Sequence, residues 1–304
     1  KSIFCVLAWG LCFPLTKLII NQGVPPLFLL SMRFFICSFL FFCLRFQTPG
    51  KETWKVVGLA LTLHALPVGL TSLAIESVDA SLASLTTQME VPFAWLLSLI
   101  FLKEKIVRRQ LIGLAISLVG IVMITESPEV SSDLDSWFML VAASFLFGCA
   151  SIQLKKISLD PFTVTGWCCL LSFPLTFSAS LFYEKPSLTL FSNIPLEVLG
   201  AVFLLAVLTM LSFWLWSGLM QTYEVNKVVT FSLLIPVSAF ILGYYILGEK
   251  AHPTTLLGSF ITMFGVIFQV MKTKKVTGSS RRAHLEASSQ TAGSIDSNKK
   301  TLLE

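Results

Sequence analysis

The chain has 304 residues, of which 55% are hydrophobic and 13% are charged, and its mean hydropathy is +0.80. Soluble domains usually carry about 25% charged residues, so this composition excludes a soluble globular fold. The apolar residues form runs of roughly 18 to 22 residues, each long enough to cross a hydrocarbon core of about 30 Å as an α-helix. We therefore expect an all-α membrane protein.

The apolar runs fall into two sets of five. The first set covers residues 3–20, 26–44, 56–74, 81–102 and 110–125. The second set covers residues 137–154, 162–182, 196–220, 228–247 and 256–271. The first run carries Lys17 near its far end and has no Ala-x-Ala site, so we interpret it as a span and not as a cleaved signal peptide. The sequence thus predicts about ten transmembrane helices.

The cysteines and the C-terminal region point to no cofactor or nucleic-acid partner. All seven cysteines lie in apolar runs without a metal or disulfide spacing, which predicts small buried hydrophobic side chains: Cys5, Cys12, Cys37, Cys43, Cys149, Cys168 and Cys169. The net charge of +5 comes partly from the basic, Ser-rich stretch after Met271. We expect residues 273–304 to form a disordered cytoplasmic tail, which accounts for this positive charge, so the charge does not indicate nucleic-acid binding.

The basic residues of the short loops predict the orientation. If the N-terminus is cytoplasmic, the outer loops contain only Lys185 and Lys250. The inner loops then hold Arg45, Lys51, Lys55, Lys103, Lys105, Arg108, Arg109, Lys155, Lys156 and Lys227. Because Lys and Arg accumulate in cytoplasmic loops, we expect both termini to be cytoplasmic.

The two sets of spans contain a repeated element. Glu-Lys-x7-Gly-x6-Gly begins at Glu104 and again at Glu249, and Pro92 matches Pro236 with one residue of slip. A weaker match pairs Trp9, Gly10 and Lys17 with Phe147, Gly148 and Lys155. A repeat of five spans cannot return the chain to its starting side, so the second copy must be inverted. We predict two inverted five-helix repeats, residues 1–126 and 127–272, with a substrate site between them near the bilayer midplane.

The sequence resembles the EamA-type carriers of the drug/metabolite transporter superfamily over nearly all of its membrane region. The resemblance rests on WGLCFPLTKLI and PPLFLLSMRF in the first two spans, on the repeated Glu-Lys segments, and on LWSGLMQTYEVNKVVTFSLLIPV. It is greatest to amino-acid-metabolite exporters of the cysteine and O-acetylserine type. It implies a ten-helix carrier of small zwitterions in a bacterial inner membrane. That family usually has a neutral amide at the position of Glu90.

Glu90 is the first candidate site residue, with Gln88 beside it. It shares an approximate helix face with Ala83, Thr86, Ala94 and Ser98. A charged group deep in lipid costs roughly 2.5 to 3.5 kcal/mol on insertion scales and tends to face an interior cavity. The carboxyl group is predicted either to bind a substrate amine or take up a proton, or to be a structural partner of Arg33.

Five further residues complete the candidate set. Arg33 lies in a Met-Arg-Phe element, where it either contacts a substrate carboxylate or supports the architecture. His64 either couples transport to protons or packs in the core. Trp9 and Trp216 either form an aromatic wall of the site or fill the bundle. Tyr223, at the turn before the ninth span, is a candidate for gating, capping or binding.

Other motif residues are interpreted as structural. Glu104 and Glu249 fall at helix ends, and Gly113, Gly120, Gly258 and Gly265 are small residues that permit close helix packing. Pro14, Pro92 and Pro236 should loosen the helix ladder within spans.

We expect a secondary transporter of amino acids or amino-acid-derived metabolites. The alternatives are a carrier of a larger cationic derivative such as S-adenosylmethionine and, more remotely, a membrane protein that does not transport. No P-loop, HExxH or GxSxG motif indicates an ATPase or an intramembrane enzyme. Import or export, proton coupling or exchange, and monomer or homodimer all stay open.

Overall fold

The computed structural model describes residues 1–45, 47–103, 108–125, 133–186, 195–249 and 253–270. Residues 1–270 form one compact unit. Within the described ranges the regular secondary structure is helical, without strands. The expected tail at 273–304, the expected repeat boundary at 126/127 and the motif residues Glu104, Lys105 and Lys250 lie outside the described residues.

Every predicted span coincides with helical structure. Most ends lie within a few residues of the predicted ends, although the third helical stretch begins earlier, at Gly50. In chain order the stretches are α1 (Ser2–Ile20), α2 (Pro26–Arg45), Gly50–Ser77, α5 to α6 (Ala80 to Phe101), α7 (Arg108–Thr125), α9 (Leu134–Lys156), α10 (Pro161–Tyr183), α12 (Leu196–Thr222), α13 to α14 (Val225 to Leu247) and α15 (Pro253–Val270).

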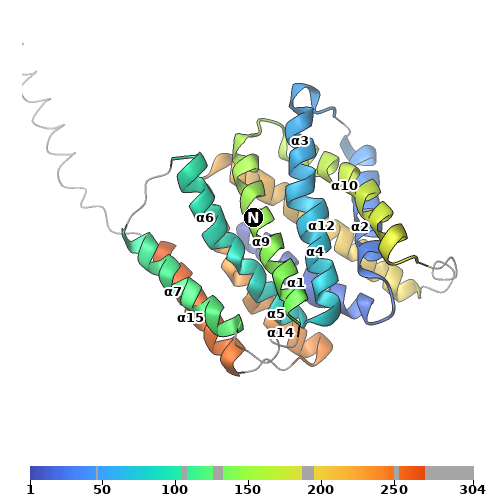
Figure 1. Cartoon of the computed structure of the whole chain (residues 1–304). Coiled ribbons are helices and arrows are strands. Elements are labelled where there is room, and N and C mark those ends of the chain that lie inside the picture. The colour runs from blue at the N-terminus through green and yellow to red at the C-terminus, as the bar shows by residue number, and fades with distance from the viewer. Residues whose placement is uncertain (46, 104–107, 126–132, 187–194, 250–252, 271–304) are drawn as a thin grey trace, which may run out of the picture. The chain divides into compact units, whose positions relative to one another are not determined.

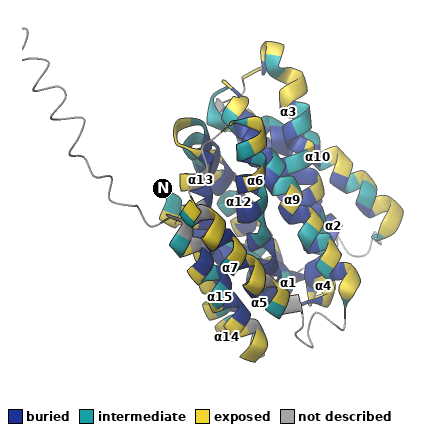
Figure 2. Ribbon diagram, turned by 60° about the vertical axis from the view of Figure 1, so that its left-hand side comes forward, coloured by how far each residue is buried: buried dark blue, intermediate teal, exposed yellow. Residues whose placement is uncertain are grey.

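The length and hydropathy of these stretches fit a membrane protein. Within the described residues, seven helical stretches are long and apolar enough to cross a bilayer. Helices α7 and α15 contain shorter apolar segments, Leu111–Gly120 and Leu256–Gly265. Figure 2 shows buried residues on the inner faces of the helices and exposed residues on the outer faces. Large apolar side chains are among the exposed ones, as expected for helices that contact lipid. The number of ten spans stays a prediction.

Three stretches are interrupted helices. The fourth changes from α5 (Ala80–Thr86) through the 3-10 turn η3 (Thr87–Met89) to α6 (Glu90–Phe101). The ninth changes in the same way from α13 (Val225–Val229) through η4 (Thr230–Leu234) to α14 (Ile235–Leu247). Pro92 and Pro236 follow these turns and have no N–H to donate to the carbonyls four residues earlier, so the α-helical ladder is broken at matching places in the two halves.

The third stretch is interrupted by a different turn. It contains α3 (Thr53–Leu59), the π-helical turn η2 (Ala60–Ala65) and α4 (Leu66–Ser77). Pro67 follows the turn and cannot donate to the carbonyl of Leu63, which accounts for the break. Turns of this kind occur frequently at functional sites.

Helices α7 and α15 pack side by side in opposite directions (Figure 1). The hydroxyl of Ser117 lies 3.3 Å from the carbonyl of Thr262, and the hydroxyl of Thr262 lies 3.4 Å from the carbonyl of Ser117. A Cβ atom on Gly120 would lie 2.5 Å from the carbonyl oxygen of Gly258, and one on Gly265 would lie 2.7 Å from that of Gly113. The sequence repeat matches Gly113 with Gly258 and Gly120 with Gly265, so exchanging the two helices turns each of these contacts into the other. A pseudo-two-fold axis near Ser117 and Thr262 therefore relates α7 to α15.

The remaining helix pairs follow the same symmetry. Helix α1 packs against α12 and α14, and its counterpart α9 packs against α4 and α6. Helices α2 and α10, which are counterparts, pack against each other. The chain therefore has the inverted two-repeat fold of a membrane protein. The odd number of spans in the repeat predicts this fold.

Two lysines at matching positions hold helix ends. The Lys17 ammonium donates to the carbonyls of Ile75, Glu76 and Val78 at 2.7, 3.0 and 3.1 Å, at the end of α4. The Lys155 ammonium donates to the carbonyls of Gln221 and Tyr223 at 3.2 and 2.8 Å, at the end of α12. The last carbonyls of a helix have no partner within it and carry partial negative charge, so a lysine stabilises each end.

Two carboxylates from the second half bind helix starts in the first half. Glu249 accepts hydrogen bonds from the backbone N–H groups of Ala80 and Ser81 at 2.8 and 3.1 Å. Glu184 accepts from the N–H groups of Leu27 and Phe28 at 2.6 and 2.9 Å. The expected structural role of Glu249 at a helix end thus has a physical basis, because free N–H groups at a helix start attract an anion.

Candidate functional site

A cavity of about 110 Å³ lies inside the bundle, between helices of both halves. Its walls come from α1, α2, the third and fourth stretches, α9, α12 and α14. The lining residues are Trp9, Cys12, Phe13, Thr16, Arg33, Leu63, Val68, Thr71, Ser72, Ile75, Thr87, Gln88, Glu90, Phe147, Phe213, Trp216 and Ile235. One water needs about 10–15 Å³ by the same kind of measure, so the cavity has room for several waters or a small metabolite.

Aromatic side chains of α1 and α12 form one wall of the cavity. The ring centroids of Trp9 and Trp216 lie 4.9 Å apart at an interplanar angle of 70°, and those of Trp9 and Phe213 lie 5.4 Å apart at 63°. Such edge-to-face contacts are favourable and fix the ring positions. Trp9 and Trp216, both predicted from the sequence, are brought together as a wall that offers ring surface to a planar or cationic group.

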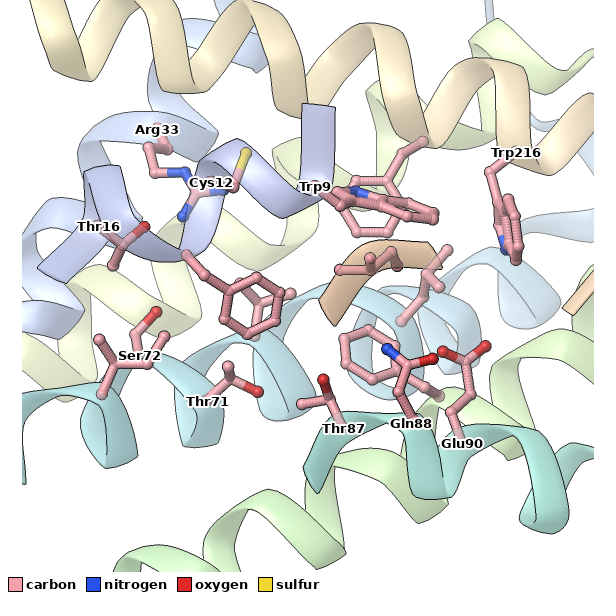
Figure 3. Close-up of a pocket in the computed structure, with 17 residues that line it drawn as sticks. Trp9, Cys12, Thr16, Arg33, Thr71, Ser72, Thr87, Gln88, Glu90 and Trp216 are labelled. Carbon is pink, nitrogen blue, oxygen red and sulfur yellow. The ribbon is translucent and has the colours of Figure 1, made fainter. Parts of the chain in front are cut away.

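Glu90 and Gln88, which belong to the interrupted fourth stretch, line the cavity (Figure 3). The Gln88 amide oxygen accepts a hydrogen bond from the hydroxyl of Ser232 at 3.3 Å, which joins η3 to η4 across the two halves. Glu90 begins α6, and its carboxyl oxygen lies 3.5 Å from the Ser151 hydroxyl, a long hydrogen bond. The carboxyl group is thus weakly engaged by protein groups and borders the cavity.

Arg33 lines the cavity together with Cys12 and Thr16, as Figure 3 shows. Its Nη2 atom donates to the hydroxyl of Thr209 on α12 at 2.7 Å. Its buried Nε atom has no hydrogen-bond partner among the described residues. The guanidinium group is therefore anchored at one nitrogen and retains a donor for another group.

The alternative that Glu90 is a structural ion-pair partner of Arg33 is not seen. Within the described part of the chain, the ion pairs are Lys55 with Glu52 and Lys227 with Glu224. Arg33 and Glu90 have separate partners, on α12 and α9 respectively. Two charge-bearing groups in one cavity without a mutual ion pair leave both able to meet a substrate.

His64 and Tyr223 lie outside the cavity lining. His64 is fully buried in the π-helical turn, with its ring 4.2 Å from the Phe213 ring and 5.6 Å from the Phe34 ring. Neither of its ring nitrogens has a hydrogen-bond partner in the described residues. Tyr223 is 54% exposed at the end of α12, where its carbonyl accepts from Lys155. Roles for them in coupling or gating stay predictions.

Several lining residues were not singled out from the sequence. They include hydroxyl side chains at Thr16, Thr71, Ser72 and Thr87. The spacing of Trp9, Cys12 and Thr16, which places them along one face of α1, was an available signal.

The cysteines lie mostly as expected. Cys5, Cys12, Cys37, Cys168 and Cys169 are buried, Cys149 is half-buried and Cys43 is exposed. The exposure of Cys43 differs from the expectation because that face of α2 points outward, as the exposed Phe39 and Phe42 on the same helix also do.

Comparison with known proteins agrees with this architecture. The model of the EamA-like transporter family matches residues 2–126 and 136–271. A "Probable amino-acid metabolite efflux pump" of Salmonella typhimurium is 29% identical over 91% of this chain and 97% of its own length. A protein of the same name from Escherichia coli is 28% identical over 88% of this chain and 93% of its own.

Two further comparisons are more distant. An "Uncharacterized transporter" of Archaeoglobus fulgidus is 24% identical over 87% of this chain and 95% of its own length. One solved crystal structure of a protein superposes with a TM-score of 0.67 at 17% identity, covering 88% of this chain and 94% of that one, which is a likeness of fold. Since the family model covers both halves, the chain belongs to the EamA-like transporter family and is a multi-pass membrane transporter of small molecules.

Proposed function

We propose that this chain is a secondary transporter that moves amino acids or amino-acid-derived metabolites across a bacterial inner membrane by alternating access. The observation that carries the proposal is the cavity between the two halves, lined by Glu90, Arg33 and the Trp9–Trp216 wall. Inverted-repeat carriers bind their substrates between the repeats, beside interrupted helices. The two relatives named amino-acid metabolite efflux pumps support the substrate class.

Matching helix interruptions support the alternating mechanism. The turns η3 and η4 belong to equivalent positions of the two halves and are joined by the hydrogen bond between Gln88 and Ser232. A bundle that opens first on one side and then on the other needs such places where a helix bends. The driving force is a proton gradient or exchange for a related metabolite. The chain acts as a monomer or a homodimer.

The sidedness and boundaries belong to the same proposal. We place both termini in the cytoplasm, the repeats at residues 1–126 and 127–272, and a cytoplasmic tail at 273–304. Reporter fusions at Glu304 test the orientation. An active cytoplasmic reporter is expected, and an active periplasmic reporter contradicts it.

A second candidate substrate is a larger cationic derivative such as S-adenosylmethionine. The aromatic pair Trp9 and Trp216 offers ring surface for a planar base, and the Glu90 carboxyl group suits a positive centre. For this second candidate the binding site is the same, and the substrate is larger.

A ligand screen on the purified protein in detergent tests the proposal. A ligand that binds the folded state at 100 times its Kd stabilises it by about 2.7 kcal/mol, which raises the melting temperature. We expect amino-acid-derived compounds to raise it and nucleotide sugars to leave it unchanged, with hits then taken up by proteoliposomes. A shift with S-adenosylmethionine alone favours the second candidate, and uptake of neither class contradicts the proposal.

A further inference from the structure

The two charge-bearing side chains of the cavity lie at its opposite ends. Figure 3 shows Arg33 beside Cys12 and Thr16 at one end, and Glu90 beside Gln88 on the side of Trp216 at the other.

Contacts along α12 give the scale of this separation. The Arg33 guanidinium is bound to Thr209, and Trp216 follows seven residues later on the same helix. Seven residues at about 1.5 Å each place these two levels roughly 10 Å apart along the helix axis. Arg33 is only 6% exposed and its head group is anchored, so it does not swing freely toward the other end.

A second set of contacts places Glu90 near the C-terminal end of α12. Its carboxyl group is next to Ser151 on α9, one helical turn before Lys155. The Lys155 ammonium binds the carbonyls of Gln221 and Tyr223, the last part of α12. Helices α9 and α12 pack against each other with these ends together. Glu90 therefore belongs to the Trp216 end, and Arg33 belongs to the Thr209 end.

The lining of the cavity is mainly apolar and includes Phe13, Leu63, Val68 and Phe213. Figure 3 shows the hydroxyl side chains of Thr71 and Thr87 between the two ends. An α-amino acid carries its ammonium and its carboxylate on the same carbon, so it presents both charges at one end of this cavity. A substrate with an apolar middle and one charge at each end matches the Arg33 end, the lining and the Glu90 end at the same time.

We infer that the cavity selects elongated zwitterions, with an acid group at Arg33 and an amine or other cation at Glu90, separated by an apolar chain of about four or more carbons. This inference rests on the proposed transport function and specifies its substrate class. Both recognition contacts are charge-assisted hydrogen bonds, the stronger kind. Both must form together for full affinity.

The test compares two isomers of one composition, 5-aminopentanoate and valine. The wild-type protein in detergent is expected to bind 5-aminopentanoate at least tenfold more tightly than valine in a thermal-shift titration, and proteoliposomes are expected to take it up faster. Pentanoate and pentylamine, which carry one charge each, are expected to bind as weakly as valine or more weakly.

Variants then assign the two ends. Glu90→Gln is expected to reduce 5-aminopentanoate binding to the level of pentanoate, and Arg33→Gln to the level of pentylamine. Arg33→Lys keeps the positive charge and is expected to retain the preference, which covers the case in which Arg33→Gln does not fold. Glu197→Gln changes an exposed carboxylate of α12 outside the cavity and serves as the matched control.

The outcomes separate this inference from the proposed function. If valine or another α-amino acid binds as tightly as 5-aminopentanoate and is transported, the elongated-substrate inference is wrong and the proposed function stands. A preference for 5-aminopentanoate that survives in both Glu90→Gln and Arg33→Gln also overturns the inference. If no amino-acid-derived compound binds or is transported, both fail.

Discussion

Glu90 is the residue whose role is most open to direct measurement. Its carboxyl group borders the cavity, and its contact with Ser151 is long. Replacing it with glutamine therefore removes little stabilising interaction from the folded protein. It removes a charge-assisted contact to a substrate cation, which is worth about 1.5–3 kcal/mol, or roughly a 10- to 100-fold change in affinity.

We expect Glu90→Gln to insert and melt like the wild type, with uptake in proteoliposomes at subsaturating substrate reduced by this factor. Melting temperature and uptake are measured on one preparation, with Glu197→Gln as the control. Unchanged uptake in a well-folded Glu90→Gln protein removes Glu90 from the site and leaves the aromatic wall as the main candidate.

Lys17 provides a test of structure at the residue scale. Its ammonium binds three carbonyls at the end of α4. Lys17→Met leaves them without that donor and is expected to cost about 1.5–3 kcal/mol of stability. Lys156→Met is the control, because among the described residues this exposed ammonium lies over the Phe101 ring, at 5.5 Å, a contact worth about 0.5–1 kcal/mol. Equal losses of thermal stability in the two variants contradict the proposed role of Lys17.

The sequence predicts candidate site residues better when they are charged or aromatic than when they carry hydroxyl groups. Burying Arg33 or Glu90 in lipid is costly, so their presence in a span indicates a cavity. Thr71 gives no such signal, because its hydroxyl can bond to its own helix, as it does with the Pro67 carbonyl at 2.8 Å. The sequence does not show which way a side chain in a span points, and the His64 ring packs beside Phe213, outside the cavity lining.

At the scale of helices, the α7–α15 pair depends on glycine. A Cβ atom on Gly265 would lie 2.5 Å from the backbone nitrogen of Ser117, and one on Gly120 would lie 2.5 Å from that of Thr262. Because backbone atoms cannot move aside, Gly120→Ala and Gly265→Ala must push the helices apart. Each is expected to destabilise the protein by about 1–3 kcal/mol in thermal or denaturant unfolding.

Gly200→Ala is the matched control for this pair. A Cβ atom on Gly200 meets nothing within 4 Å, and the residue lies in α12. Alanine is a better helix former than glycine by about 0.8–1 kcal/mol, so this change should be neutral or stabilising. Losses at Gly120 and Gly265 no larger than the change at Gly200 contradict close packing of α7 on α15.

The positions of the helices could be predicted from hydropathy, whereas the interruptions within them could be predicted only in part. A membrane span must be apolar over its length, so its limits are visible in the sequence. Of the three prolines expected to loosen helices, Pro92 and Pro236 follow the breaks at η3 and η4, whereas α1 continues through Pro14 as one α-helix. The π-helical turn before Pro67 was not foreseen, because proline within a span is also tolerated without such a turn.

For the whole molecule, the inverted repeat was predictable because the Glu-Lys-x7-Gly-x6-Gly element recurs after an odd number of spans. The pairing of α7 with α15 and the reciprocal contact of Ser117 with Thr262 agree with that symmetry. The cavity was not predictable in detail, because it depends on which faces of seven helical stretches meet.

The central claim is that this cavity opens alternately to the two sides of the membrane and holds the substrate. Native Cys12 lies in the cavity lining and Cys43 on an exposed face of α2, so the chain carries its own probe and control. The most direct measurement is alkylation of Cys12 in sealed vesicles by a membrane-impermeant thiol reagent, added from one side or the other and read by peptide mass spectrometry. We predict that Cys12 reacts from both sides and that a transported substrate slows both reactions, while the rate at Cys43 does not respond to substrate. Reaction of Cys12 at a rate that substrate leaves unchanged, in vesicles that demonstrably transport it, would contradict the account.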